Sequence, residues 1–281
     1  MATDVAPRAH TDINVKAERS YRRRRRNDRA LRIGLGAGVP LALLLLWQVS
    51  ATVGIIDERF FPAPSVIVSR AIEDAVAGTL LGDLGTQLKA TLVRILAGIA
   101  IGVTSGILVG TLMGSVRAVR YAIAPLVYAL YPMPKLAILP LLLIVFGIGD
   151  VSKIALVSLG VFFVVGLSAF SGTLYTSQVY EDVSHAFAFP RLMRYGRVVL
   201  PAALPSIMSG VKLGIGQALI LVVSVEFVNS NNGIGYFIWQ SWQTLDIPRM
   251  FIGLLCVAIG GAAAVFLGDL CERLLVPWAK H

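Results

Sequence analysis

Long apolar segments separated by short polar ones run through most of this 281-residue chain. The hydrocarbon core of a bilayer is about 30 Å thick, so a helix needs about 20 apolar residues to cross it. The segments that reach this length lie at about 33–56, 91–114, 121–146, 153–174, 206–228 and 250–270. The pattern predicts an all-α polytopic membrane protein with about six transmembrane helices.

The stretch after the first apolar segment has a different pattern. From Val68 to Leu80, apolar residues recur at every fourth position, with charged residues between them. This periodicity predicts an amphipathic helix, with Ser65 as its N-cap. The helix is too short to cross the membrane, so we expect it to lie on the outer surface.

The composition agrees with a membrane protein, because 56% of residues are hydrophobic, 15% are charged and the mean hydropathy is +0.76. The net charge is +9, but Lys and Arg cluster beside the apolar segments, as in Arg22–Arg26. Lys and Arg that set the orientation of a membrane protein are distributed in this way. The net charge therefore does not indicate nucleic-acid binding, and we expect no nucleic-acid partner. The distribution predicts that both termini lie inside, and Arg94 is assigned to the outer end of the second span.

Five glycines at every fourth position mark the second apolar segment. Such a helix would be weak in water, where each Gly costs about 1 kcal/mol relative to Ala. In a bilayer the same stripe lets another helix approach closely. The stripe therefore predicts a helix-packing surface formed by Gly98, Gly102, Gly106, Gly110 and Gly114.

The third apolar segment contains four prolines and Lys135 near its middle. It cannot form one straight helix, and broken helices at membrane depth occur where protein buries them or where they line a watery cavity. A lysine there costs roughly 2.5–3.5 kcal/mol unless it has a partner. Two interpretations follow. Either Lys135 lines a pathway and meets an anionic substrate, or it has a local role, in which it binds carbonyl groups freed by the prolines or points toward an aqueous end of the span.

Polar and proline residues within the apolar segments are the candidates for a translocation pathway. Glu226 either pairs with Lys135 or gates the pathway, or it is a solvated carboxylate at the membrane interface. The full candidate set is Pro132, Pro134, Lys135, Pro140, Gln217 and Glu226.

The sequence contains no Gly-x4-Gly-Lys-Ser/Thr motif that would hold nucleotide phosphates. If ATP drives the protein, another subunit must hydrolyse it. We identify no catalytic residues and no metal ligands, and we expect a non-enzymatic chain.

A polar segment at 176–205 separates two apolar spans. Arg191, Arg194 and Arg197 share one helix face, and Leu200-Pro201 and Leu204-Pro205 are expected to end that helix. A basic loop of this kind is expected on the cytoplasmic side.

This loop resembles the EAA loop of ABC-importer permeases, which reads Glu-Ala-Ala, three residues, Gly, nine residues, Ile, one residue, Leu-Pro. Only Leu200 and Pro201 are identical to the pattern, and Ala188 replaces its turn-forming Gly. In that family the loop forms a coupling helix docked on the ATPase. The resemblance assigns this role to Asp182, Val183, Ser184, Ala188, Arg191, Arg194, Val198, Leu200 and Pro201.

A second resemblance covers PMPKLAILPLLLIVFGIGDVSKIALVSLGVFF at 132–163. It is similar to the IPKxALxPLxxxWFGxGxxSKIxxxxLGxFFP signature of sulfonate, nitrate and taurine permeases, with Val145 in place of Trp and Val164 in place of Pro. Two shorter matches to the same group are FPAPSVIVSR at 61–70 and GIGYF at 233–237.

The resemblance covers most of 40–270 and implies a type I ABC-importer permease of a bacterial plasma membrane. The implied partners are a second permease copy in a homodimer, two ATP-binding cassette subunits and an extracytoplasmic substrate-binding protein. ATP and Mg²⁺ would bind to the ATPase, and this chain would bind no cofactor. The domains would be a basic cytoplasmic tail at 1–30, the first transmembrane and outer amphipathic helices at 31–84, a permease domain at 85–275 and a cytoplasmic tail at 276–281.

The implied function is to form the pathway for a small anion such as a sulfonate, taurine or nitrate, although the family also handles thiamine-precursor pyrimidines. The alternative is an ATP-independent channel or a secondary carrier. Such carriers often have matching broken helices in two halves. Only the third apolar segment here is heavily interrupted by proline, which favours the importer.

Overall fold

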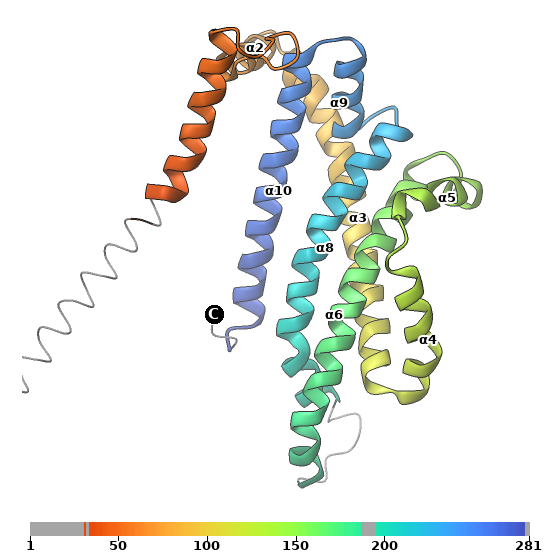
Figure 1. The fold of residues 1–281 in the computed structure, drawn as a ribbon. Helices are drawn as coiled ribbons and strands as arrows, with labels where there is room; N and C mark the ends of the chain where they lie inside the picture. The colour runs from red at the N-terminus through yellow and green to blue at the C-terminus, as the bar shows by residue number, and fades with distance from the viewer. Residues whose placement is uncertain (1–30, 32–33, 187–194, 279–281) are drawn as a thin grey trace, which may run out of the picture. The chain divides into compact units, whose positions relative to one another are not determined.

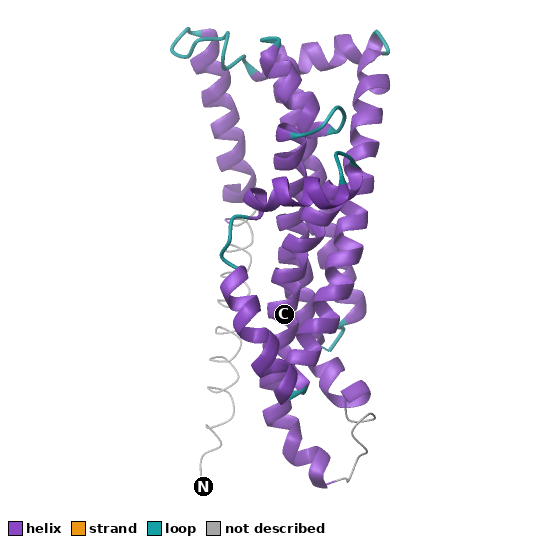
Figure 2. Cartoon of the chain, turned by 90° about the vertical axis from the view of Figure 1, so that its right-hand side faces the viewer, coloured by secondary structure: helices purple, strands orange, loops and turns teal. Residues whose placement is uncertain are grey.

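The computed structural model describes residues 31, 34–186 and 195–278, and every regular element in these ranges is helical (Figure 2). The chain divides into two units, Met1–Ser69 and Arg70–His281. They are described separately.

In the first unit, an apolar helix at Gly34–Thr52 is followed by a turn and by the start of α2 (Pro64–Val76). Ser65 is not the N-cap, because α2 already begins at Pro64, a residue well suited to the first helical position. The side chain of Gln48 takes the capping role instead. Its Oε1 accepts the Ser65 backbone N–H at 3.0 Å, and its Nε2 donates to Ser65 Oγ at 2.9 Å.

The second unit is a bundle of long helices with shorter ones at their ends (Figure 1). Its elements are α3 (Thr79–Ser115), α4 (Arg117–Leu130), the 3-10 helix η1 (Lys135–Ile138), α5 (Leu139–Phe146), α6 (Asp150–Ala186), the π-helical turn η2 (Tyr195–Val199), α8 (Leu200–Val228), α9 (Ile234–Gln243) and α10 (Ile247–Leu275).

The core of this unit lies where α3, α6 and α8 pack together. The glycine stripe of α3 lies directly on α6, and a methyl group built on any of its five glycines would come within about 3 Å of α6 atoms. The contacts keep the same order along both helices: Gly98 meets Val157, and Gly114 meets Thr173. The helices α3 and α6 therefore run parallel, and the segment between them must return the chain to the end of the bundle where α3 began.

That returning segment is the broken helix predicted from its prolines. The α4 and η1–α5 parts are bent by 100° relative to each other. Pro132 and Pro134 lie in the break. Pro140 lies at the start of α5. Backbone N–H groups in the first turn make no hydrogen bond within the helix, so a proline there costs none. Because α3 and α6 run in the same direction, the chain between them must run the length of the bundle once in the opposite direction. The bent pair makes this crossing.

Five helices among the described residues are long and apolar enough to cross a membrane, and the bent pair makes a sixth span. This confirms the prediction of an all-α protein with about six spans. The apolar part of α6, Asp150–Tyr175, agrees with the predicted span at about 153–174, and the helix continues to Ala186. Two details differ: α3 begins at Thr79 and not near 91, and Pro205 lies inside α8 instead of ending a helix. A proline inside a membrane helix is tolerated where neighbours compensate the lost backbone bond.

The last helix, α10, has a side-chain cap at its start and ion pairs to α8 near its end. Asp246 caps its start by accepting the Arg249 backbone N–H at 3.3 Å. Near its end, Lys212 of α8 places Nζ 2.6 Å from Glu272 Oε2 and 3.1 Å from Asp269 Oδ1.

Candidate functional site

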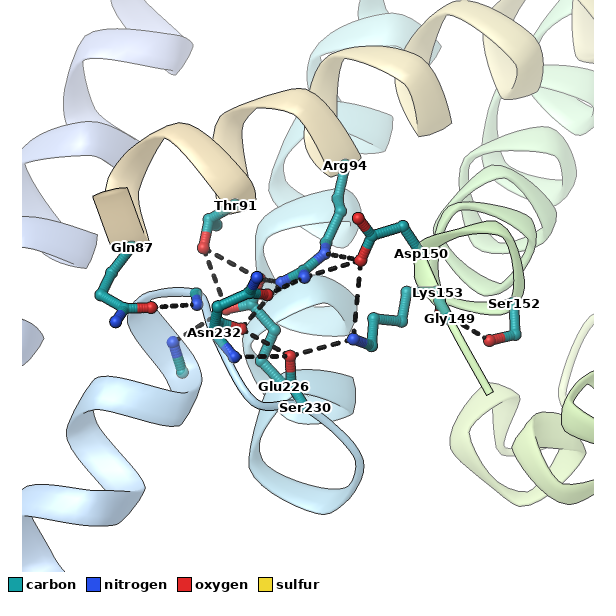
Figure 3. A network of polar contacts seen from close by, with 12 residues as sticks. Gln87, Thr91, Arg94, Gly149, Asp150, Ser152, Lys153, Glu226, Ser230 and Asn232 are labelled. Carbon is teal, nitrogen blue, oxygen red and sulfur yellow. Dashed lines mark hydrogen bonds and ion pairs between the residues drawn. The ribbon is translucent and has the colours of Figure 1, made fainter. Parts of the chain in front are cut away.

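A group of polar side chains, buried at its centre and exposed at its edge, joins α3, α6 and α8 at the end of the bundle where α3 and α6 begin (Figure 3). We call it the Arg94 cluster, and it consists of Thr91, Arg94, Asp150, Lys153, Glu226, Ser230 and Asn232.

The Arg94 guanidinium is the centre of this cluster. Arg94 and Glu226 are both 0% exposed, with Nη1 2.6 Å from Glu226 Oε1. Nε and Nη2 of Arg94 donate to Asp150 Oδ1 at 2.9 and 2.7 Å. Nη1 also donates to the backbone carbonyl of Asn232 at 3.0 Å, and Nη2 donates to its side-chain oxygen. One side chain on α3 thus binds α6, α8 and the segment after α8.

The charges of the cluster balance. Lys153 Nζ lies 3.6 Å from Asp150 Oδ1 and donates to Ser230 Oγ at 3.0 Å. Two cations, Arg94 and Lys153, therefore face two carboxylates, Asp150 and Glu226. A buried charge is tolerated only when it is paired and hydrogen-bonded, and this arrangement meets both conditions.

The cluster also caps α9. The first backbone N–H groups of a helix lack helical partners and carry a partial positive charge. Here Gly235 N–H donates to Glu226 Oε2 at 2.8 Å and Ile234 N–H donates to Thr91 Oγ1 at 2.8 Å. Thr91 Oγ1 in turn donates to Glu226 Oε1 at 2.9 Å, and Gly233 N–H donates to Gln87 Oε1. Glu226 is therefore both the partner of Arg94 and the cap of α9.

This close approach explains the Gly-Ile-Gly sequence before Tyr236. Gly233 has φ +110°, and a methyl group there would lie 2.3 Å from the Glu226 carboxyl group. A methyl group on Gly235 would lie 2.6 Å from the Val223 carbonyl oxygen. Only glycine fits at either position.

The structure corrects two of the alternatives for Glu226. Glu226 does not pair with Lys135, and it is not a solvated carboxylate, because Arg94, Thr91 and Gly235 enclose it. Arg94, assigned by the sequence to the outer end of the second span, is a buried partner of Glu226. The signal was present in the sequence: an arginine inside an apolar segment needs a partner.

Lys135 lies where α4 gives way to η1, at the bend of the broken span. Its Nζ donates to the backbone carbonyl of Tyr131, the residue that follows α4. Nζ also lies 5.1 Å from the ring centroids of both Tyr131 and Phe163, a cation–π arrangement. The carbonyl bond is the one expected from the second interpretation of this lysine. Among the described contacts, no direct polar bond joins Lys135, Gln217 and Glu226.

The predicted coupling residues fall into three groups. Asp182, Val183 and Ser184 lie on the last turns of the α6 backbone. Val198 belongs to η2, and Leu200 and Pro201 form the first turn of α8. The remaining three lie outside the described residues: Ala188, Arg191 and Arg194.

Together, the parallel α3 and α6, the broken third span and the long α8 and α10 define a polytopic helical membrane protein. The family model described as "Binding-protein-dependent transport system inner membrane component" matches residues 102–281.

Several named relatives are similar in sequence to most of the chain. The taurine transport system permease protein of Escherichia coli K12 is 31% identical, covering 88% of this chain and 90% of the relative. An aliphatic sulfonates transport permease protein of Bacillus subtilis 168 is 30% identical, with 86% and 87% covered. The formylaminopyrimidine transport permease protein of Halalkalibacterium halodurans is 29% identical, with 85% and 94% covered.

A solved structure shows the same fold. It is a chain of the MetNI methionine ABC transporter in an inward-facing conformation, with a TM-score of 0.63, 18% identity and coverage of 70% of this chain and 97% of that chain. The chain belongs to the binding-protein-dependent transport system inner membrane component family. It is an ABC transporter permease subunit and a multi-pass protein of the bacterial inner membrane, as its sequence resemblance implied.

Proposed function

We propose that this chain lines the pathway of an ATP-driven importer for a small organic anion of the sulfonate or taurine type. The observation that carries the proposal is the sequence identity of 30–31%, over most of the chain, with permeases named for aliphatic sulfonates and taurine. Lys135 supports an anion over a neutral pyrimidine, because it is a cation held at the bend of a broken span.

The proposed assembly contains two copies of this chain, two ATP-binding cassette subunits and an extracytoplasmic binding protein. ATP and Mg²⁺ bind to the cassette subunits, and this chain binds no cofactor. The coupling loop at 176–205, with its coupling helix at 182–196, docks on the ATPase. ATP closes the ATPase dimer, the docked segments move with it, and the spans open toward the loaded binding protein.

Reconstituted transport tests this proposal. Proteoliposomes holding the permease and its ATPase, with binding protein outside and ATP inside, are expected to take up labelled taurine or an alkanesulfonate. Replacing ATP by ADP is expected to stop uptake. Uptake at the same rate with ADP would establish the channel or carrier alternative.

Lys135→Gln is expected to raise the KM for anion uptake roughly tenfold or more, because a charged hydrogen bond contributes about 1.5–3 kcal/mol. Lys135→Arg keeps the charge and is expected to lose less. The matched control is Lys89→Gln, an exposed lysine on α3. Initial uptake rates at a series of solute concentrations decide the question, and an unchanged KM in Lys135→Gln would argue against contact with the solute.

Ala188→Glu is expected to uncouple ATP hydrolysis from transport, because it places a charge in the proposed docking segment. Ala188→Gly restores the residue of the family pattern and is expected to transport normally. The measurement is the number of solute molecules imported per ATP hydrolysed. If both variants match the parent, Ala188 is not part of the docking surface.

A further inference from the structure

The Arg94 cluster fixes one segment of the chain, Asn229–Gly235, to three helices at once. Arg94 binds both the backbone and the side chain of Asn232. Lys153 of α6 binds Ser230, and Glu226 of α8 binds Gly235 N–H. The segment leads directly into α9, so the position of α9 depends on these bonds.

Two of the three helices lead, at their other ends, into the proposed ATPase-docking segment. The helix α6 ends at Ala186, and α8 begins at Leu200. The cluster binds the opposite ends of the same helices, at Asp150 and Glu226. One end of the α6–α8 pair therefore meets the docking segment, and the other carries Asn229–Gly235.

The pair is packed too closely for its helices to move independently. A methyl group on Gly160 would lie 2.1 Å from Leu221, and one on Gly210 would lie 2.4 Å from Ser168. Ser206 Oγ also donates to the Ser168 carbonyl at 2.9 Å. Close-packed interiors transmit displacement because they contain little free volume. A movement at one end of the pair reaches the other end.

We propose that Arg94 is a positioning residue for transport: it holds Asn229–Gly235 and the start of α9 to the α6–α8 pair, so that movement begun at the ATPase reaches this end of the permease. The inference rests on the proposed function, because it concerns how ATP-driven movement is passed on. It adds a role for Arg94, Asp150, Glu226 and Asn232 at the end of the molecule remote from the ATPase.

Two neighbouring asparagines provide a matched test. Asn232→Ala removes one side-chain hydrogen bond to Arg94, and Asn232 is itself exposed. Arg94 and Glu226 keep each other as partners in this variant. Asn231→Ala changes the same residue type one position earlier, where the side chain is exposed and no described contact involves it. Asn232→Gln keeps an amide oxygen as an acceptor for Arg94 without changing the charge of the cluster, and serves as the conservative rescue.

The first readout is hydrogen exchange at the amides of Gly233, Ile234 and Gly235 in the purified complex. The second is the number of taurine molecules imported per ATP hydrolysed in proteoliposomes. Asn232→Ala is expected to speed exchange and to lower the transport ratio several-fold at equal assembly. Asn231→Ala and Asn232→Gln are expected to match the parent in both.

Unchanged exchange in Asn232→Ala would overturn the holding role. Faster exchange with a parental transport ratio would overturn the role in transport. A parent complex with no ATP-driven uptake would count against the proposed function itself, and the exchange comparison would still decide whether Arg94 holds the segment.

Discussion

Glu226→Ala is expected to destabilise the permease by about 3–5 kcal/mol, the range for removing one partner of a buried ion pair. The substitution leaves the fully buried Arg94 with one fewer carboxylate and removes the acceptor for the Gly235 N–H. Stability of most domains is only 5–15 kcal/mol. We therefore expect a large drop in the yield of folded protein and in its thermal unfolding temperature in detergent.

A double variant shows whether the pair itself causes this loss. Arg94→Met with Glu226→Met removes the fully buried pair and leaves Lys153 paired with Asp150, whose side chain is 58% exposed and can be solvated. It is expected to be more stable than Glu226→Ala, because residues in direct contact do not contribute additively. A Glu226→Ala protein that unfolds at the parental temperature would show that the pair contributes little.

Gly110→Leu is expected to prevent the packing of α3 on α6. A methyl group at this position would lie 2.3 Å from the Gly166 carbonyl oxygen and 2.8 Å from the Ala169 methyl group. The nearest obstacle is backbone, which cannot rotate away, so the cost should exceed the 1–3 kcal/mol usual for overpacking. The measurement is the fraction of protein recovered as a monodisperse species from the membrane.

The control lies on the same helix. Gly85→Ala has nothing within 4 Å of the added methyl group and is expected to be recovered like the parent. If Gly110→Leu is recovered equally well, the stripe does not determine the packing of these two helices.

Much of the fold could be predicted because each feature depends on local sequence. The length of each apolar segment identifies it as a membrane span, because the thickness of the bilayer sets the number of residues needed to cross it. The prolines of the third segment predict its break, and the 100° bend is found there. The glycine stripe indicated a close contact, although its partner α6 could not be identified from the stripe alone.

The Arg94 cluster could not be predicted in the same way. Its residues extend from Thr91 to Asn232 and come from three helices and a connecting segment, and their pairing depends on the parallel packing of α3 and α6. Pairing of Glu226 with Lys135 is one of the alternatives that the sequence leaves open, because sequence does not show at which depth each residue lies. The continuation of α6 to Ala186 could not be predicted either, because a polar composition at 176–186 does not by itself stop a helix.

The most direct test of the proposed importer is to identify what binds the permease in its native membrane. Membranes would be cross-linked before gentle extraction, and the tagged chain purified with everything attached to it. The account predicts a P-loop ATPase in equal amount with the permease. Recovery of the chain without any ATPase, with and without cross-linking, would contradict it and would favour an ATP-independent channel or carrier.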